Sequence, residues 1–462
     1  MKLYDTLSST KKPFVPIDEA CVRLYACGPT VYDLAHIGNA RSAVVYDMLF
    51  RLLKEKYKNV VYVRNITDVD DKIIDAAEAA GQNIQDFVGQ YVRYFHEDMK
   101  ELNCLSPTVE PRATAEIEVM VAIIGRLIER GHAYVKNGSV YFNIASYERY
   151  GELSGRKIGE MIAGNRVEVD ADKLHPGDFV LWKPATDKDR KLSACWKSPW
   201  GEGRPGWHIE CSAMSYRYLG ESFDIHGGGA DLMFPHHENE LAQNMCAFSE
   251  GSYARYWVHN GFLTVNGGEK MSKSLGNVIT VRGLRESGIS GAIIRYVFLC
   301  THYRKPLDWN NKAVADAKAA LDKISRACED FTYDQLNNEI DRVDVDSSVI
   351  CSLRDDMNTP GAISALHALV TDINKEDDTE EKLRLARVLN KSAKLMGITN
   401  GFAGRDLAED VDAEEIERLI DRRKDARVSG DFVLADKIRD QLHSMGVVVF
   451  DEKDGTTRWR KN

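Results

Sequence analysis

Two short segments, far apart in the chain, carry residues suited to binding a polyphosphate. The first, His36-Ile37-Gly38-Asn39, opens a run of apolar residues at helical spacing. A helix start offers unpaired N–H groups and a positive dipole to phosphate. Gly38 would let a nucleotide approach the backbone, and His36 could donate to a phosphate oxygen. A histidine at a helix start is more often a cap or a surface residue, so this segment alone decides little.

The second segment is Lys270-Met271-Ser272-Lys273-Ser274, which lies among Gly267, Gly268 and Gly276. Two ammonium groups on a glycine-hinged loop can close over a polyphosphate and neutralise the charge that grows as pyrophosphate leaves. Lys270 and Lys273 are therefore candidate catalytic groups, together with His36 and Asn39. An exposed basic turn is the alternative interpretation.

Four residues could ligate a metal ion: Cys27, Cys211, His236 and Glu240. His236 and Glu240 are four residues apart, which places them on one face of a helix. Two thiolates, an imidazole and a carboxylate suit a tetrahedral zinc ion. From the residues alone His237 and Glu238 compete as ligands, and a polar helix start that binds no metal is the other interpretation.

A glycine-rich segment, His226-Gly227-Gly228-Gly229-Ala230-Asp231, follows a predicted strand near residues 222–225. Three glycines after a strand would let the backbone lie against a flat adenine, and Asp231 could accept from ribose hydroxyls. Gly228 and Asp231 are therefore candidate ATP-binding residues. A flexible turn explains the same residues equally well.

The elements that must position these groups begin with predicted strands at residues 22–26 and 60–63, joined by a helix over about residues 39–57. Such a βαβ unit indicates a doubly wound parallel sheet, whose ligands sit beyond the carboxyl ends of the strands. Cys27 and residues 29–36 fall at that edge. We expect an α/β protein with a Rossmann-like catalytic domain.

The rest of the chain is expected to form additional parts around this domain. Residues 1–101 and 201–310 would be its two halves, and residues 102–200 an inserted domain. Helical periodicity predicts an α-helical bundle over 311–403, followed by a small α+β unit over 404–462. The last unit holds basic and aromatic residues that could bind phosphates and stack unpaired bases, although a solvated helix face and a frayed tail would also explain them: Arg422, Arg423, Lys424, Arg427, Trp459 and Arg460.

Composition limits the class of protein. The net charge of -10 argues against a general nucleic-acid coat, so any RNA contact must come from local basic patches. Nine cysteines without a framework spacing favour a reducing compartment. No apolar run approaches the ~20 residues needed to cross a bilayer, and no secretory signal begins the chain. We expect a cytoplasmic monomer.

Together these residues resemble the cysteinyl-tRNA synthetase family of the class I aminoacyl-tRNA synthetases. The likeness covers nearly the whole chain, through residues 25–32, 65–72, 206–212, 226–240, 270–274 and 355–360. It implies that Cys27, Cys211, His236 and Glu240 hold zinc, in preference to His237 and Glu238. It also implies that Thr67, Trp207 and His226 shape a cysteine pocket. The class motif ends in histidine where this chain has Asn39, an amide that can still donate to phosphate.

The resemblance implies ATP-dependent activation of L-cysteine, with Mg²⁺ accompanying ATP, and transfer of cysteine to the 3′ end of tRNA(Cys). One Zn²⁺ per chain would recognise the substrate thiolate and so exclude serine. A rival activity transfers the same adenylate to an amino sugar, but the roughly 150 residues beyond Asn311 favour tRNA. A catalytically silent tRNA-binding paralogue is the other rival, against which Lys270, Lys273 and the metal candidates count.

Overall fold

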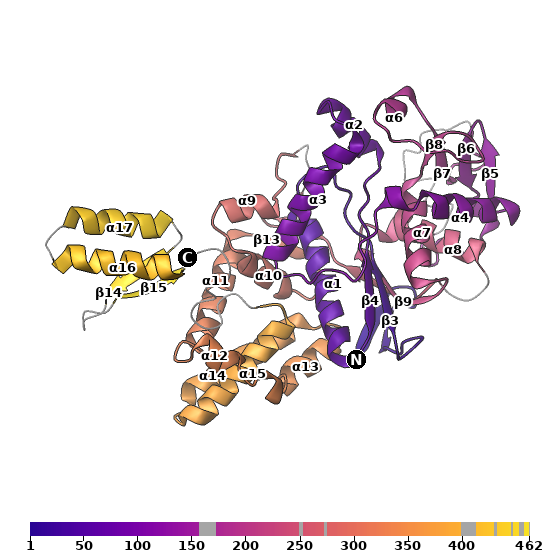
Figure 1. The fold of residues 1–462 in the computed structure, drawn as a ribbon. Helices are drawn as coiled ribbons and strands as arrows, with labels where there is room; N and C mark the ends of the chain where they lie inside the picture. The colour runs from indigo at the N-terminus through magenta and orange to yellow at the C-terminus, as the bar shows by residue number, and fades with distance from the viewer. Residues whose placement is uncertain are drawn as a thin grey trace. The chain divides into compact units, whose positions relative to one another are not determined.

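The computed structural model describes residues 1–156, 172–248, 253–271, 275–398, 413–428, 432–444, 447–451 and 457–461 (Figure 1). The chain divides into two compact units. The first comprises Met1–Lys318, Val345–Leu366 and Ser392–Ile398, and the second comprises Ala319–Asp344, His367–Lys391 and Thr399–Asn462. Within the described ranges, no helix has the length and apolar character that a membrane crossing requires.

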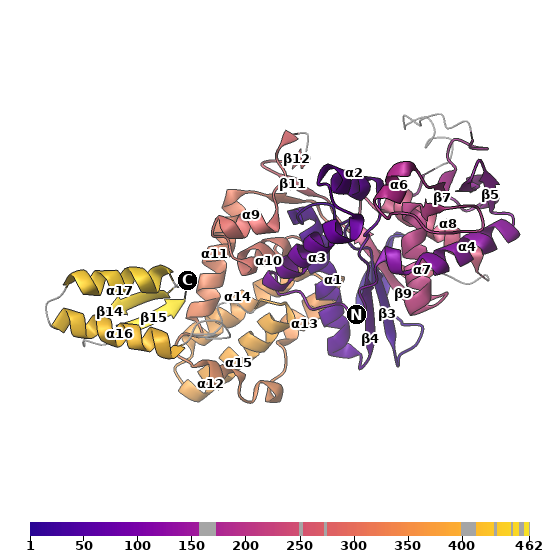
Figure 2. The same ribbon diagram turned by 45° about the horizontal axis from the view of Figure 1, so that its top comes forward.

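A parallel sheet forms the centre of the first unit. Its strand order is β10 (Ala254–Asn260), β9 (Phe223–Gly229), β3 (Val22–Ala26) and β4 (Val60–Arg64). Helix α1 (Ile37–Lys56) connects β3 to β4 and lies beside the sheet in Figures 1 and 2. The predicted βαβ unit and α/β class are confirmed, and the helix begins two residues before the expected start.

Between β4 and β9 the chain forms a second, antiparallel sheet. It contains β5 (Ala133–Lys136), β6 (Ser139–Phe142), β7 (Phe179–Pro184) and β8 (Gly203–Pro205), with α4 (Ile117–Glu129), α6 (Asp187–Lys191) and α7 (Trp207–Leu219) around it. Tyr25 and Trp257 of the parallel sheet share one hydrophobic core with Ile124 of α4 and Trp182 of β7. The residues between β4 and β9 therefore pack directly against the parallel sheet.

A third, three-stranded sheet carries the lysine segment. Strand β11 (Leu263–Val265) pairs antiparallel with β12 (Glu269–Lys270) and parallel with β13 (Leu307–Trp309). The remaining elements of residues 1–398 are β1 (Lys2–Asp5), β2 (Thr10–Pro13), α2 (Asp71–Ala79), α3 (Ile84–Glu101), α8 (Glu238–Ala247), α9 (Val281–Glu286), α10 (Gly291–Leu299), α11 (Asn311–Arg326), α12 (Tyr333–Asn337), α13 (Ser347–Arg354), α14 (Thr359–Lys375) and α15 (Thr379–Leu395), with a π-helical turn at Met233–His237 and short 3-10 turns at Ala113–Ala115, Ile144–Ser146 and Ile340–Arg342. The predicted change to helices after residue 311 is confirmed.

The C-terminal residues form two helices and a hairpin of strands. Helix α16 (Ala413–Val428) packs against α17 (Phe432–Ser444) through Leu419, Ile420, Ile438 and Leu442. Strands β14 (Val447–Asp451) and β15 (Thr457–Lys461) pair antiparallel. This arrangement agrees with the small α+β unit expected at the end of the chain.

Candidate metal and nucleotide site

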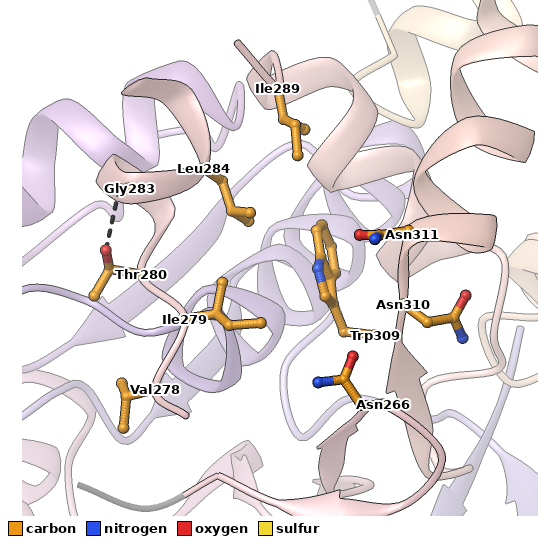
Figure 3. A pocket seen from close by; sticks show the side chains of 10 residues that line it. All are labelled: Asn266, Val278, Ile279, Thr280, Gly283, Leu284, Ile289, Trp309, Asn310 and Asn311. Carbon is orange, nitrogen blue, oxygen red and sulfur yellow. Dashed lines mark hydrogen bonds between the residues drawn. The ribbon is translucent and has the colours of Figure 1, made fainter. Parts of the chain in front are cut away.

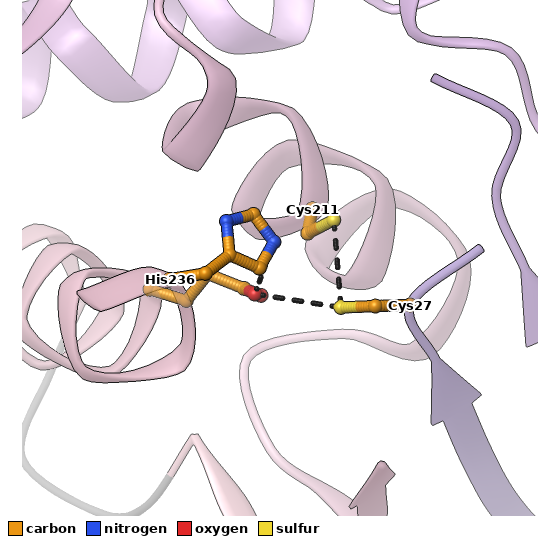
Figure 4. A group of neighbouring side chains, drawn as sticks. Cys27, Cys211 and His236 are labelled. Carbon is orange, nitrogen blue, oxygen red and sulfur yellow. Dashed lines mark hydrogen bonds and ion pairs between the residues drawn. The ribbon is translucent and has the colours of Figure 1, made fainter. Parts of the chain in front are cut away.

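Four side chains from three separate segments meet at the carboxyl edge of the parallel sheet. Cys27 follows β3, Cys211 lies in α7, His236 precedes α8 and Glu240 lies within it. Their ligand atoms all lie within 4.8 Å of one another. Figure 4 shows the side chains of Cys27, Cys211 and His236 pointing toward a common centre. The structure thus brings together all four predicted metal ligands.

The spacing of these atoms fits a tetrahedral ion. The two Sγ atoms are 3.7 Å apart, and Cys27 Sγ lies 3.6 Å from Glu240 Oε1. Sulfur ligands bound at 2.3 Å to a tetrahedral zinc would be about 3.8 Å apart. His236 Nε2 lies 3.0 Å from the same Glu240 oxygen, which keeps the two side chains on one face. The donor types and separations therefore fit zinc.

A second donor set shares two of these ligands. Cys27 and Glu240 also group with His226 and His237, and Cys27 Sγ lies 3.2 Å from His237 Nε2. His237, which the sequence also offers as a metal ligand, is therefore close enough to Cys27 to compete with His236. Glu238, the other competitor, instead accepts hydrogen bonds from the amides of Gly151 and Ser154 at 2.9 and 2.8 Å. We find no place for Glu238 in the donor cluster.

The electrostatics of the cluster depend on burial and on the neighbouring charges. Burial lowers the pKa of His236, but Glu240 and Cys211 outweigh it and raise that pKa. Burial raises the pKa of Glu240, but His226 and His236 outweigh it and lower that pKa. Burial together with Cys211 and Glu240 raises the pKa of Cys27 well above its usual value. Without a cation, the two thiols cannot readily ionise together, and a bound metal would supply that charge.

The three residues expected to form a cysteine pocket border this cluster. The Trp207 ring stacks on His236 with centroids 4.1 Å apart, and 36% of the Trp207 surface is exposed. His226 is buried, and its Nε2 lies 3.8 Å from Cys27 Sγ. Thr67 Oγ1 donates to Glu210 Oε2 at 3.1 Å, beside Cys211 in the chain. Trp207 and His226 therefore lie against the metal ligands, and Thr67 lies next to them through Glu210.

Several buried polar residues support the cluster and were not predicted. Asn65 Oδ1 accepts from the Gly28 amide at 2.8 Å, and its Nδ2 donates to Thr67 Oγ1 at 3.3 Å. Tyr253 donates its hydroxyl hydrogen to Glu240 Oε2 at 3.0 Å. Asn65 stands in the segment that resembles the family, but nothing in its spacing indicates that it would lie beside Gly28.

The structure shows a capping role for the histidine motif, and its contact with phosphate stays a prediction. His36 Nδ1 accepts hydrogen bonds from the amides of Gly38 and Asn39 at 3.1 and 3.2 Å, and caps α1. In the neutral ring the proton therefore resides on Nε2, which keeps donor character. The Ile37 amide also donates to Ile279 at 2.9 Å, which ties the motif to the segment after the lysine loop.

Of the two candidate lysines, the structure describes one. Lys270 is exposed in β12, whereas Lys273 lies outside the described residues, as do Ser272 and Ser274. A Cβ atom added to Gly38 would lie 3.7 Å from Met271 Cε. The start of the lysine loop is therefore adjacent to the histidine motif, as a shared phosphate site requires.

The glycine block differs from its prediction. Gly227, Gly228 and Gly229 are the last residues of β9 and are buried, so they form part of the strand and not a loop after it. A Cβ on Gly227 would lie 2.2 Å from the Tyr46 ring, and one on Gly228 would lie 2.6 Å from the His237 ring. Close packing within the chain already requires these glycines. Asp231 follows the strand, and its ribose contact stays a prediction.

A cavity of about 340 Å³ lies beside the third sheet (Figure 3). Its lining includes Asn266 and Val278, which flank the lysine loop, and Trp309 of β13. No lining residue is charged, and none belongs to the predicted site. The predicted chemistry therefore lies outside this cavity.

The C-terminal basic residues lie on two elements. Arg422, Lys424 and Arg427 of α16 are exposed, whereas Arg423 is buried. Its burial makes Arg423 less suited to bind a phosphate than its neighbours. Trp459 and Arg460 lie in β15, opposite Val449 and Val448 of β14.

Family models match three consecutive parts of the chain. A model of the class I (C) tRNA synthetase catalytic domain matches residues 13–319, and a DALR-domain model matches residues 348–400. A model of the cysteinyl-tRNA ligase anticodon-binding domain matches residues 412–460. The matches thus extend over most of the sequence.

Similar proteins cover the chain from end to end. The cysteine-tRNA ligase of Anaplasma phagocytophilum (strain HZ) is 73% identical over 461 residues, and that of Anaplasma marginale (strain St. Maries) is 66% identical over 466 residues, each match covering 100% of both chains. The one from Wolbachia pipientis wMel is 54% identical and covers 99% of this chain and 100% of its own. Mycobacterium tuberculosis methionyl-tRNA synthetase in complex with methionyl-adenylate superposes with a TM-score of 0.55 at 15% identity, over 81% of this chain and 89% of that one. This last likeness concerns the fold.

Proposed function

The chain belongs to the cysteine-tRNA ligase family of class I tRNA synthetases, and on this premise we propose that it activates L-cysteine with ATP and transfers it to the 3′ end of tRNA(Cys). The observation that carries the proposal is the meeting of Cys27, Cys211, His236 and Glu240 at the sheet edge from which α1 and its histidine motif begin. A thiol-binding metal centre beside a phosphate site suits a reaction that joins cysteine to a nucleotide.

We propose that these four residues hold one Zn²⁺ per chain. The bound ion would lower the pKa of the substrate thiol and take the thiolate as a soft ligand. A site that reads size alone separates close analogues by only ~10², whereas a ~10⁵ preference for cysteine over serine needs ~7 kcal/mol. An alcohol is a poor zinc ligand, so the donor set itself would exclude serine.

Glu240 is proposed as the ligand that yields when cysteine arrives. Its Oε2 is held by the Tyr253 hydroxyl at 3.0 Å and lies 3.4 Å from His226 Nε2. These partners would keep the buried carboxylate hydrogen-bonded after it leaves the metal, which limits the cost of its release. Thr67, Trp207 and His226 would form the walls around the substrate.

Activation is proposed to proceed by in-line attack of the cysteine carboxylate on the α-phosphate of Mg²⁺-bound ATP. His36, through Nε2–H, and Asn39 would donate to phosphate oxygens at the start of α1, where Gly38 leaves the backbone accessible. Lys270 and Lys273 would neutralise the charge on departing pyrophosphate. Gly228 and Asp231 would contact the adenosine. No protein nucleophile is needed, because positioning and charge stabilisation lower the barrier.

The C-terminal unit is proposed to read the anticodon. Arg422, Lys424 and Arg427 are exposed on one helix and can bind phosphates, while Trp459 and Arg460 offer base stacking. Arg423, which is buried, would support the tRNA-binding surface from inside the C-terminal unit. We also propose that the chain has five parts, with boundaries after residues 101, 200, 310 and 403. The protein is proposed to be a cytoplasmic monomer.

The test is cysteine-dependent exchange of pyrophosphate into ATP, run beside charging of purified tRNA. We expect exchange with cysteine, at least 10³-fold less with serine, and charging of tRNA(Cys). Exchange without charging, but with transfer to an amino sugar, would favour the rival ligase. Loss of both reactions in the zinc-loaded protein would favour the silent paralogue.

A further inference from the structure

Arg41 is a buried cation in α1 that the activation chemistry does not use. It lies two residues after Asn39, and 1% of its surface is exposed. Burial lowers the pKa of its guanidinium to about 10, and the groups that accept its hydrogen bonds are backbone carbonyls, not carboxylates. Burying an unpaired guanidinium is costly, so its hydrogen bonds need an explanation.

All the hydrogen bonds of the Arg41 guanidinium go to backbone carbonyls of two other segments. Its Nη1 donates to Gly261 at 2.8 Å and to Phe262 at 2.6 Å. Its Nη2 donates to Lys305 at 2.6 Å and to Tyr303 at 3.3 Å. The planar fork of the guanidinium fixes the positions of these carbonyls relative to α1.

The two segments lead directly into the sheet that carries the lysine loop. Phe262 immediately precedes β11, and Lys305 precedes β13 by two residues. The segments touch so closely that a Cβ on Gly261 would lie 2.6 Å from the Lys305 carbonyl oxygen. Strand β11 then pairs with β12, where Thr264 lies opposite Lys270. Arg41 therefore connects α1, the helix of the histidine motif, to the base of the hairpin that β11 and β12 form and that presents Lys270.

Asp308 of β13 holds the same hairpin from its far end. Its carboxylate accepts hydrogen bonds from the amides of Gly267 and Gly268, at 3.1 and 2.9 Å, and from Thr264 Oγ1 at 3.0 Å. Gly267 and Gly268 have φ values of 93° and 104°, which side chains rarely adopt. The hairpin that presents Lys270 is thus fixed at its base by Arg41 and at its turn by Asp308.

We propose that Arg41 is a positioning residue that sets the distance between the histidine motif and the β11–β12 hairpin that presents Lys270, with Asp308 as its counterpart at the turn. The inference rests on the proposed function, because it assigns these residues to adenylate formation. Misplacing a catalytic group by about 1 Å can reduce a rate by ~10²-fold. Substrate binding at the metal cluster should be unaffected, because that cluster lies on α7, α8 and the end of β3.

The experiment compares Arg41→Lys and Asp308→Asn in the full-length zinc-loaded protein. Both should lower kcat for cysteine-dependent pyrophosphate exchange by about 10- to 100-fold, while the KM for cysteine changes less than about twofold. Arg51→Lys is the matched control, since Arg51 lies on the same helix and its Nη atoms donate to the carbonyls of Asn103 and Lys394, away from the hairpin. Its kcat should stay within about twofold of the wild type.

The outcomes separate this inference from the proposed function. Absence of exchange in the wild type would refute the proposed function. Exchange in the wild type with unchanged kcat in Arg41→Lys would overturn the positioning role, and so would equal losses in Arg41→Lys and Arg51→Lys. If Arg41→Lys does not fold, Asp308→Asn decides, because Asp308 is partly exposed and its replacement preserves size. An unchanged kcat in that variant then overturns the proposal.

Discussion

The Sγ atoms of Cys27 and Cys211 lie 3.7 Å apart, although 184 residues separate them in the sequence. A disulfide would bring them to about 2.05 Å, whereas two thiolates on one tetrahedral zinc would be about 3.8 Å apart. The pair therefore has the geometry of metal ligands. Each cysteine comes from a different element, so the pair can form only when β3 and α7 are correctly packed.

Replacing Cys211 should remove the metal. We expect Cys211→Ser to lower zinc content from about one ion per chain to well below half, and to weaken cysteine binding, because an alcohol is a poor zinc ligand. Emission spectrometry of the dialysed protein measures the ion. Cys246→Ser is the control, since Cys246 is also buried but lies outside both donor groups. Full activity of metal-free protein would refute the zinc hypothesis.

Glu240 should be the most dispensable ligand, and Tyr253 should govern how firmly it binds. We expect Glu240→Gln to retain more zinc than Cys211→Ser. Loss of the Tyr253 hydroxyl in Tyr253→Phe should speed zinc release to a chelator less than Cys211→Ser does, because Tyr253 orients only the weakly held Glu240. Chelator absorbance follows the release. Equal zinc loss in Glu240→Gln and Cys211→Ser would contradict the displaceable-ligand hypothesis.

Lys273→Ala should slow adenylate formation by ~10²-fold or more and leave cysteine binding nearly unchanged, because the ammonium group acts mainly as pyrophosphate departs. Exchange rates and equilibrium binding of cysteine are measured separately. Lys305→Ala provides a comparison with a lysine near the hairpin but outside the loop. A parallel loss of binding and rate in Lys273→Ala would indicate that Lys273 maintains the pocket instead.

A chain ending at residue 403 should separate the two half-reactions. It keeps His36, Lys273 and the metal ligands but lacks the basic helix, so pyrophosphate exchange should survive and tRNA charging should fall. Intact protein should also lose tRNA affinity more steeply with added salt, because phosphate contacts release counterions. Filter binding at several salt concentrations measures the slope. Equal charging by both forms would contradict the anticodon-reading role.

Asp98 should make stability depend on pH. Burial raises its pKa from 3.8 to about 6, against the opposing effect of Arg282 and Arg285. A carboxyl group whose pKa is higher in the folded state stabilises the fold below its unfolded pKa, and loses that contribution as pH rises through 6. Relative to Asp98→Asn, the wild type should lose roughly 1–2 kcal/mol of unfolding free energy between about pH 5 and pH 8.

Chemical denaturation at the two pH values measures this difference. Glu97→Gln is the control, because the Arg282 hydrogen bond lowers the pKa of Glu97. The contribution of a lowered carboxyl pKa is complete above its unfolded value, so it should not vary between pH 5 and pH 8. The same difference between Asp98→Asn and wild type at both pH values would refute the assignment.

Patterns of local spacing predicted much of the fold. The strand at Val22–Ala26 and the helix that follows it were recognisable from periodicity, and their order indicated the parallel sheet. Ligands of a doubly wound sheet bind beyond the carboxyl ends of its strands, and this rule placed Cys27 at the ligand-binding edge. His236 and Glu240 were likewise placed together by their spacing of four residues.

Contacts between distant segments could not be predicted in the same way. Nothing local in Asn65 indicates that it accepts a hydrogen bond from Gly28, because that contact depends on the register of β3 against β4. The glycines of β9 were misplaced after the strand, since glycine normally indicates a turn, whereas here Tyr46 and His237 occupy the space of a side chain. Arg423 appeared equivalent to its basic neighbours until the packing of α16 was known.

The order in which the ligands occur along the chain has a consequence for biosynthesis. Glu240 follows Cys27 by 213 residues. At about 5–20 residues per second, the ribosome needs roughly 10–40 s to add them. During this interval β3 can pair with β4, but its other neighbour, β9, has not been made. The Cys27 thiol of a nascent chain therefore lacks its proposed partner ligands until α7 and α8 have been made, and the proposed zinc would bind after β3, β4 and β9 but before β10 completes the sheet.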